Sequence, residues 1–98
     1  MFVKIHRSYR KVVAICDSEL VGKKFEEGKM QLDVRENFFK GEKFDKEKVV
    51  EIMKSERADD STFNIVGKKA VKLALENGII GNGNIGKVEG IPFALVLL

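Results

Sequence analysis

The chain has 98 residues, which is enough for one hydrophobic core and too few for two, so we expect a single domain over residues 1–98. Lysine and glutamate supply most of the 34% charged residues, a composition typical of proteins from hot environments, and the net charge is +3. One cysteine excludes an internal disulfide, no leader pattern opens the chain, and the apolar run from Ile91 to Leu98 is too short to span a bilayer. We therefore expect a soluble, cytoplasmic protein with no membrane partner.

Apolar alternation and dense apolar runs predict the strands of the fold, at residues 2–8, 12–16, 23–25, 30–34 and 91–98. The first two strands would form a hairpin with residues 9–11 at its tip. Apolar residues at helical spacing predict two main helices, at residues 45–57 and within 64–78. Asp45 suits the N-cap of the first helix, and Gly78 suits the C-terminal end of the second. A polar loop, residues 58–62, separates them.

The order of these elements indicates an α+β fold, because strands come first, two helices follow and a strand returns. We expect a mostly antiparallel sheet of about five strands, with the two main helices on one face. Asp17 directly follows the second strand and can cap a short helical turn. Of the neighbouring aromatic residues Phe38 and Phe39, we expect one in the core and the other partly exposed.

Three patterns that could indicate chemistry are better explained as structure. Residues 81–86 match the letters GxGxxG, but a helix precedes them and the chain ends too soon afterwards for a βαβ unit, so we predict a turn that binds no dinucleotide. His6 would pair near Val13 in the hairpin, too far from Cys16 for a nucleophile–base pair. One histidine and one cysteine cannot make a zinc site. We expect no catalytic residues, metal or cofactor.

Two lysines at the start of the second main helix break a local rule. Lys68 and Lys69 occupy its first turn, where the helix dipole disfavours cations. Together with free backbone N–H groups and with Gly67, which permits close approach, they would make a phosphate site. The alternative is that an exposed first turn simply tolerates lysine.

Basic residues also cluster at the tip of the predicted hairpin. Arg7, Arg10 and Lys11 flank Tyr9 in the sequence. An aromatic ring between cations suits stacking on an unpaired base with phosphate contacts around it. The alternative is that Tyr9 packs against its own hairpin.

Several short stretches, taken in order and spacing, resemble a known family. They are KIHRS, VVAICDSELVGKKFEEGK, LDV, FFKGE, NIVGKKAVKLALENG and the closing GIPFA. Together they are similar to the domain-of-unknown-function family numbered 424, over nearly the whole chain. The resemblance implies an archaeal, cytoplasmic, single-domain protein, offers a weak link to translation, and supplies no catalytic residues.

We therefore predict a domain that binds RNA or a ribonucleoprotein through one basic face. The residues assigned to this face are Arg7, Tyr9, Arg10, Lys11, Gly67, Lys68, Lys69 and Lys72. A second hypothesis is a protein-interaction module whose acidic middle, Glu26 to Asp60, meets a basic partner. A small enzyme is the third hypothesis, ranked last because acid–base candidates are scarce.

Overall fold

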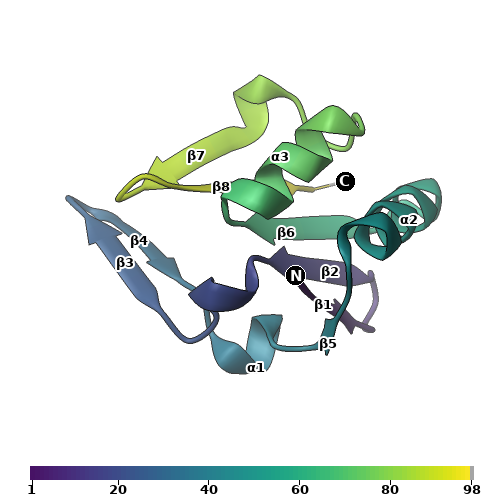
Figure 1. Ribbon diagram of the computed structural model, residues 1–98, viewed down its shortest axis with the longest axis horizontal. Coiled ribbons are helices and arrows are strands. Elements are labelled where there is room, and N and C mark those ends of the chain that lie inside the picture. The colour runs from purple at the N-terminus through teal and green to yellow at the C-terminus, as the bar shows by residue number, and fades with distance from the viewer. Residues whose placement is uncertain (98) are drawn as a thin grey trace.

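The computed structural model describes residues 1–97, and one six-stranded sheet organises this part of the chain in the order β5-β1-β2-β6-β8-β7 (Figure 1). The strands of this sheet are β1 (Phe2–His6), β2 (Val12–Cys16), β5 (Glu42–Lys43), β6 (Thr62–Val66), β7 (Ile85–Val88) and β8 (Ile91–Val96). A separate hairpin consists of β3 (Lys24–Glu27) and β4 (Met30–Asp33). The helices are α1 (Glu36–Phe39), α2 (Lys46–Ala58) and α3 (Lys68–Glu76), with single 3₁₀ turns η1 (Ser18–Leu20) and η2 (Asn82–Asn84).

The expectation of an α+β fold with a mostly antiparallel sheet is confirmed. Every pair of neighbouring strands is antiparallel except β2 and β6, which run parallel with Val12 beside Thr62 and Cys16 beside Val66. A parallel pair needs a long crossover connection, and here the segment containing the β3–β4 hairpin, α1, β5 and α2 supplies it.

Among the strands that the sequence pattern does not predict, β5, β6 and β7, the central one is β6. The pattern predicts a loop through Thr62 and a helix within 64–78, whereas residues 62–66 form a strand and α3 begins only at Lys68. A short apolar run that adjoins a helix cannot be separated from it by periodicity alone. The β-branched residues Ile65 and Val66 favour the extended conformation, and the central position of β6 in the sheet buries them.

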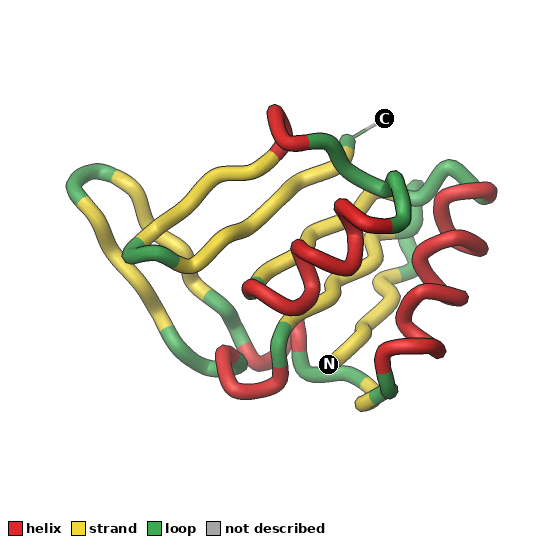
Figure 2. The backbone as a smooth tube through the Cα atoms, turned by 45° about the horizontal axis from the view of Figure 1, so that its top comes forward, coloured by secondary structure: helices red, strands yellow, loops and turns green. Residues whose placement is uncertain are grey.

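The sheet has two unlike faces. One face, here called the helix face, carries Val3, Val13, Ile15, Phe63, Ile65 and Ala94, which form a core with buried residues of both α2 and α3. The other, called the hairpin face, carries Phe2, Ala14, Cys16, Val66 and Phe93, which pack with residues of η1, α1 and the β3–β4 hairpin. Figure 2 shows α3 lying across the strands and α2 beside it.

Helix α2 begins where the sequence predicts. The Asp45 carboxylate accepts a hydrogen bond from the Lys48 backbone N–H at 2.9 Å, which satisfies one of the free donors of the first turn. Val49 and Met53 are fully buried, and Ile52 is half-buried beside them. The helix therefore contributes a narrow apolar stripe to the core of the helix face.

The β3–β4 hairpin is fastened to the turn between β7 and β8. The Glu26 backbone N–H donates to the Glu89 carboxylate at 2.8 Å, and the Glu89 backbone N–H donates to the Glu27 carboxylate at 2.6 Å. Figure 1 shows the tips of the two hairpins at the same end of the molecule. These contacts therefore join the two hairpins at one end of the hairpin face.

Candidate functional site

The N-terminus of α3 already holds an anion from the chain itself. The Asp17 carboxylate accepts hydrogen bonds from the backbone N–H groups of Lys69 at 3.0 Å and Ala70 at 2.9 Å. Asp17 is 3% exposed. It does not cap η1, as the sequence suggests, but caps a helix more than fifty positions away. The N–H groups predicted to hold a phosphate beside Lys68 are thus bonded to Asp17.

Gly67 serves this internal cap. Its backbone has a φ of 111°, a conformation that residues with a side chain rarely adopt. A β-carbon at this position would also overlap the Asp17 carboxyl group. Gly67 therefore permits the close approach of the Asp17 side chain, and not of the phosphate that the sequence predicts.

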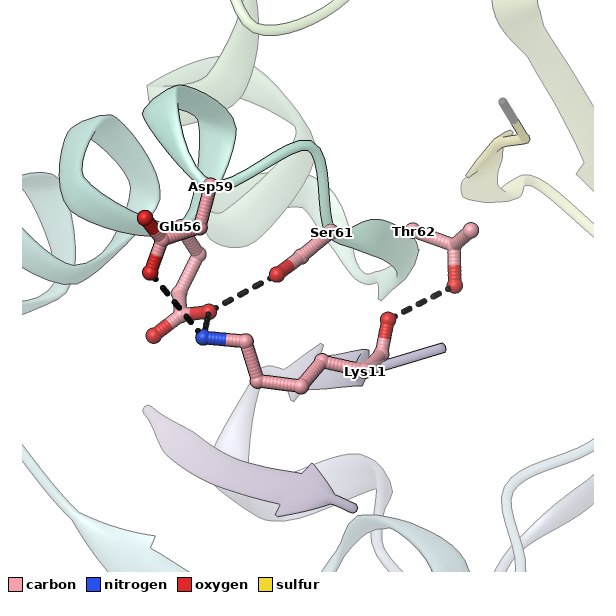
Figure 3. Close-up of polar contacts among 5 residues, drawn as sticks. All are labelled: Lys11, Glu56, Asp59, Ser61 and Thr62. Atoms are coloured by element: carbon pink, nitrogen blue, oxygen red, sulfur yellow. Dashed lines mark hydrogen bonds and ion pairs between the residues drawn. The ribbon is translucent and has the colours of Figure 1, made fainter. Parts of the chain in front are cut away.

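Lys11 is part of a polar network that joins the β1–β2 hairpin to the end of α2 (Figure 3). Its ammonium group lies 2.9 Å from the Glu56 carboxylate and 3.1 Å from that of Asp59. The Ser61 hydroxyl donates to Glu56 at 2.8 Å, and the Thr62 hydroxyl donates to the Lys11 carbonyl at 3.2 Å. Two carboxylates thus already engage the cation assigned to phosphate binding.

The pKa values of this network agree with its geometry. The hydrogen bonds to Glu56 and then to Asp59 raise the pKa of the Lys11 ammonium above its ordinary value. Partial burial by itself raises the pKa of the Glu56 carboxyl, but hydrogen bonds from Lys11 and Ser61 bring that pKa below its ordinary value. Both groups are therefore held in their charged forms, as a structural ion pair requires.

The rest of the hairpin tip faces solvent. Arg7, Tyr9 and Arg10 are exposed, and Tyr9 is 100% exposed, so it does not pack against its own hairpin. Asp59 and Asp60 line the same shallow hollow as Tyr9 and Arg10. The tip thus combines an exposed aromatic ring with charges of both signs.

The two basic clusters lie apart in the fold. The hairpin tip, residues 7–11, immediately precedes the start of β2, and Lys68 and Lys69 follow the end of β6. Because β2 and β6 are parallel and in register from Val12–Thr62 to Cys16–Val66, the clusters lie at opposite ends of this strand pair. Lys72 lies one turn further along α3, on the side of the sheet that the helices cover. The single basic face thus stays a prediction, and its two clusters are separated by the length of this strand pair.

A different candidate site lies on the hairpin face, in the part that the β3–β4 hairpin leaves open. A hollow of about 260 Å³ is lined by Leu32, Asp33, Phe38, Phe39, Asn64, Ile65, Val66, Phe93, Ala94 and Leu95. A second hollow, of about 490 Å³, adjoins it and is lined by His6, Asp33, Arg35, Asn37 and Phe38. The two share Asp33 and Phe38, and together they are called the Phe38 site. It combines apolar walls with a few polar groups, as ligand sites commonly do.

Neighbouring side chains hold the Phe38 ring in place. His6 stacks on it with ring centroids 4.4 Å apart and planes 15° apart, and the Phe39 ring meets its edge at 5.0 Å. The Nε2 atom of His6 lies 2.8 Å from the Phe38 carbonyl, and the Lys4 ammonium donates to the Asn37 carbonyl at 2.6 Å. Phe39 is buried while Phe38 is partly exposed, so the expected division between the two rings is confirmed.

Asn64 is the least expected residue of the Phe38 site. It occupies the middle of β6, a central strand, although asparagine is depleted in strands. Its strand neighbours are Ala14, which is small, and Leu95. The side chain is half-buried, and no hydrogen bond from it is found within residues 1–97. A polar residue that breaks a local rule without an internal partner is a sign of function.

The polar rim of the site carries both signs of charge. The Arg35 guanidinium lies 3.3 Å from the Asp33 carboxylate, and both side chains remain largely exposed. Each keeps hydrogen-bonding capacity for a ligand, since a guanidinium has five donors and a carboxylate accepts several bonds. The site can therefore offer an amide, a carboxylate and a guanidinium around an aromatic wall.

The GxGxxG letters lie in a turn and a strand. Residues 81–86 form the turn η2 and the start of β7, and no helix follows them. Gly86 lies against the Phe93 ring, where a β-carbon would clash. Within residues 1–97, no cluster of three or more acidic, cysteine and histidine side chains is arranged to hold a metal ion. No helix in this range is long and apolar enough to cross a membrane.

Cys16 is far from the only histidine. In the β1–β2 register Cys16 pairs with Phe2, whereas His6 pairs with Val12 at the opposite end. The thiol is 0% exposed, and burial, with a further contribution from the charge of Asp17, raises its pKa to about 12.

We expect Cys16 to be inert in the folded protein, because the thiolate is the reactive form and the sulfur is shielded from solvent. A water-soluble maleimide followed by mass spectrometry should show slow labelling of the native protein and fast labelling in denaturant. Rapid labelling without denaturant would contradict the burial of this residue.

Comparison with known proteins gives a family and a fold. The family model described as "Protein of unknown function (DUF424)" matches residues 5–98. A solved structure, described as that of an uncharacterized conserved protein from Methanopyrus kandleri, is similar with a TM-score of 0.80 at 22% identity, covering 97% of this chain and 88% of that one. No curated protein matches. At this level of identity the structural likeness shows the fold alone.

Proposed function

The chain belongs to the DUF424 family of proteins of unknown function, and we propose that it is an RNA-binding module that takes an unpaired base into the Phe38 site. The observation that carries the proposal is the Asn64 amide, which faces an aromatic hollow and has no hydrogen-bond partner within residues 1–97. The amide therefore has free donors and an acceptor to offer a ligand in the hollow.

An unpaired base matches the chemistry of this site. A base has flat apolar faces that stack on aromatic rings and an edge that carries donors and acceptors. Phe38 offers a partly exposed ring held by His6, and the amide of Asn64 can donate and accept at the same base edge. The Asp33 carboxylate can accept from an exocyclic amino group. The proposal therefore uses each unusual feature of the hollow.

The phosphates on either side of this base would meet the nearest exposed cations. Arg35 lines the site itself, and Arg7 follows directly after His6 at the end of β1. Tyr9, fully exposed two residues further on, can stack on a neighbouring base. The RNA path thus keeps the hairpin tip of the sequence hypothesis but leaves out Lys11 and the lysines of α3.

The proposal is tested by the binding of short fluorescent single-stranded RNAs, measured by anisotropy at several salt concentrations. Phe38→Ala should weaken binding about tenfold or more, since stacking contributes roughly 1–3 kcal/mol per base. Phe38→Tyr keeps the ring and should bind almost as the natural protein does. Asn64→Ala should reduce the preference for one base over the others.

Two outcomes would contradict this proposal. Binding that is weak and independent of salt would exclude phosphate contacts, because phosphate binding releases counterions. The second outcome is that alanine at Lys68 and Lys69 lowers the RNA affinity while Phe38→Ala leaves it unchanged. The RNA would then bind at the start of α3 and not at the Phe38 site. A thermal melt of each variant separates loss of binding from loss of folding.

The second hypothesis, an acidic surface for a basic partner, receives less support. Several acidic residues between 26 and 60 already have partners within the fold. Glu26 and Glu27 belong to the contact with Glu89, while Glu56 and Asp59 pair with Lys11. The carboxylates of Glu27, Glu56 and Asp59 are thus already engaged, whereas Glu26 joins its contact through the backbone N–H.

A further inference from the structure

A groove of about 440 Å³ lies between α3 and the edge of the sheet, on the helix face. It is lined by Lys68, Val71, Lys72, Leu75, Asn82, Ile85, Lys87 and Pro92, and is called the α3–β7 groove. Its apolar members include Leu75 and Ile85, which are half-buried. The three lysines surround this apolar lining.

The three lysines of the groove lack acidic partners. Lys68, Lys72 and Lys87 are exposed, and none of them forms an ion pair within residues 1–97. Elsewhere Lys11 and Lys48 form such pairs, whereas Lys29 and Lys54, which stand apart from the groove, form none in the part of the chain that the structure describes. The groove therefore presents a concentrated positive charge beside apolar surface, and it is complementary to a ligand that is both acidic and apolar.

The floor of the groove ends at a free strand edge. Strand β7 is the last strand of the sheet and pairs only with β8. Lys87 faces Pro92, whose carbonyl accepts from the Gly67 backbone N–H on the β6 side. The Pro92 carbonyl thus points away from β7, so the pair is not hydrogen-bonded, and the N–H and C=O of Lys87 point outward.

We propose that the α3–β7 groove docks an extended acidic segment of a partner protein, which adds to β7 as a further strand. Main-chain hydrogen bonds to the outward groups of Lys87 would give affinity, and alternate side chains would give specificity. Apolar side chains of the segment would enter the groove beside Leu75 and Ile85. Its carboxylates would meet Lys68, Lys72 and Lys87.

The surroundings set the limits of this docking. Glu89 follows β7 and is tied to the β3–β4 hairpin, which places negative charge at that end. The acidic segment should therefore lie along the Ile85–Lys87 part of the strand. This surface lies on the opposite face from the Phe38 site, so the inference does not depend on RNA binding there.

The probe for the experiment is a fluorescent peptide of about eight residues that alternates glutamate and leucine, long enough to cover one strand. Lys68→Glu combined with Lys87→Glu should weaken its binding about tenfold or more, which corresponds to about 1.4 kcal/mol. Lys29→Glu combined with Lys54→Glu makes the same change in net charge at exposed positions outside the groove. This control should change the affinity less than about twofold.

Strand addition is tested separately from charge. Proline is tolerated at an edge position whose N–H faces solvent, so Lys87→Pro should fold but bind more weakly than Lys87→Ala. The same peptide with methyl groups on alternate backbone nitrogens removes the donors without changing the protein. At least one methylation register should bind several-fold more weakly, since a hydrogen bond contributes about 0.5–1.5 kcal/mol.

Three results would overturn the inference. Equal binding of a peptide with glycine in place of leucine would show that the apolar floor is not used. Equal loss in the control variant would show attraction by net charge alone. The third result is that single-stranded RNA displaces the peptide and that the Lys68→Glu, Lys87→Glu variant binds neither of them. That result would make the groove a general polyanion site.

Discussion

Replacing Asp17 with alanine is expected to lower the free energy of unfolding by about 3 kcal/mol, because two backbone N–H groups, one buried and one partly buried, lose their acceptor. Those groups belong to Lys69 and Ala70, and the site is too enclosed for free access of water. Lys68 and Lys69 would then stand at a helix N-terminus with no negative charge to balance the dipole. Urea unfolding followed by circular dichroism measures the loss.

Two companion variants make this test specific. Asp45→Ala removes the exposed cap of α2 and should lower the same free energy by only about 1 kcal/mol. Gly67→Ala should be destabilising although it removes no hydrogen bond, since it forces a β-carbon into the Asp17 carboxyl at a positive φ. Equal effects of Asp17→Ala and Asp45→Ala would mean that the buried cap is no stronger than a surface one.

The sequence predicts elements well where local chemistry decides them. Asp45 marks the start of α2, and the alternation around Ile5 with the apolar run around Ile15 marks the first hairpin, because caps and apolar patterns act over a few residues. The parallel position of β6 is set by a crossover of more than forty residues, which no local pattern records. Ile65 and Val66 therefore look like an extension of the helix that follows them.

The candidate sites divide in the same way. The lysines at the start of α3 are unusual for a first helical turn, as the sequence indicates. The anion at this helix end is Asp17, which is distant in sequence and is brought close by the parallel pair β2–β6. Asn64 was open to recognition as a polar break in the run FNIV. That signal becomes visible only when β6 is known to be a central strand.

Replacing Leu73 with alanine is expected to cost about 2–5 kcal/mol of unfolding free energy, through lost transfer energy and the cavity left behind. Leu73 is 3% exposed and packs in the core that joins α2 and α3 to the sheet.

The matched control is Lys72→Ala on the exposed side of the same helix, which should stay within about 0.5 kcal/mol. Both variants introduce alanine, which has a high helix propensity. The difference between their unfolding free energies therefore reports packing and not helix formation. Urea unfolding with an unchanged slope would show that both variants unfold from a comparable native state. Similar losses from the two would contradict the assignment of the buried face of α3, and with it the position of the lysines that line the α3–β7 groove.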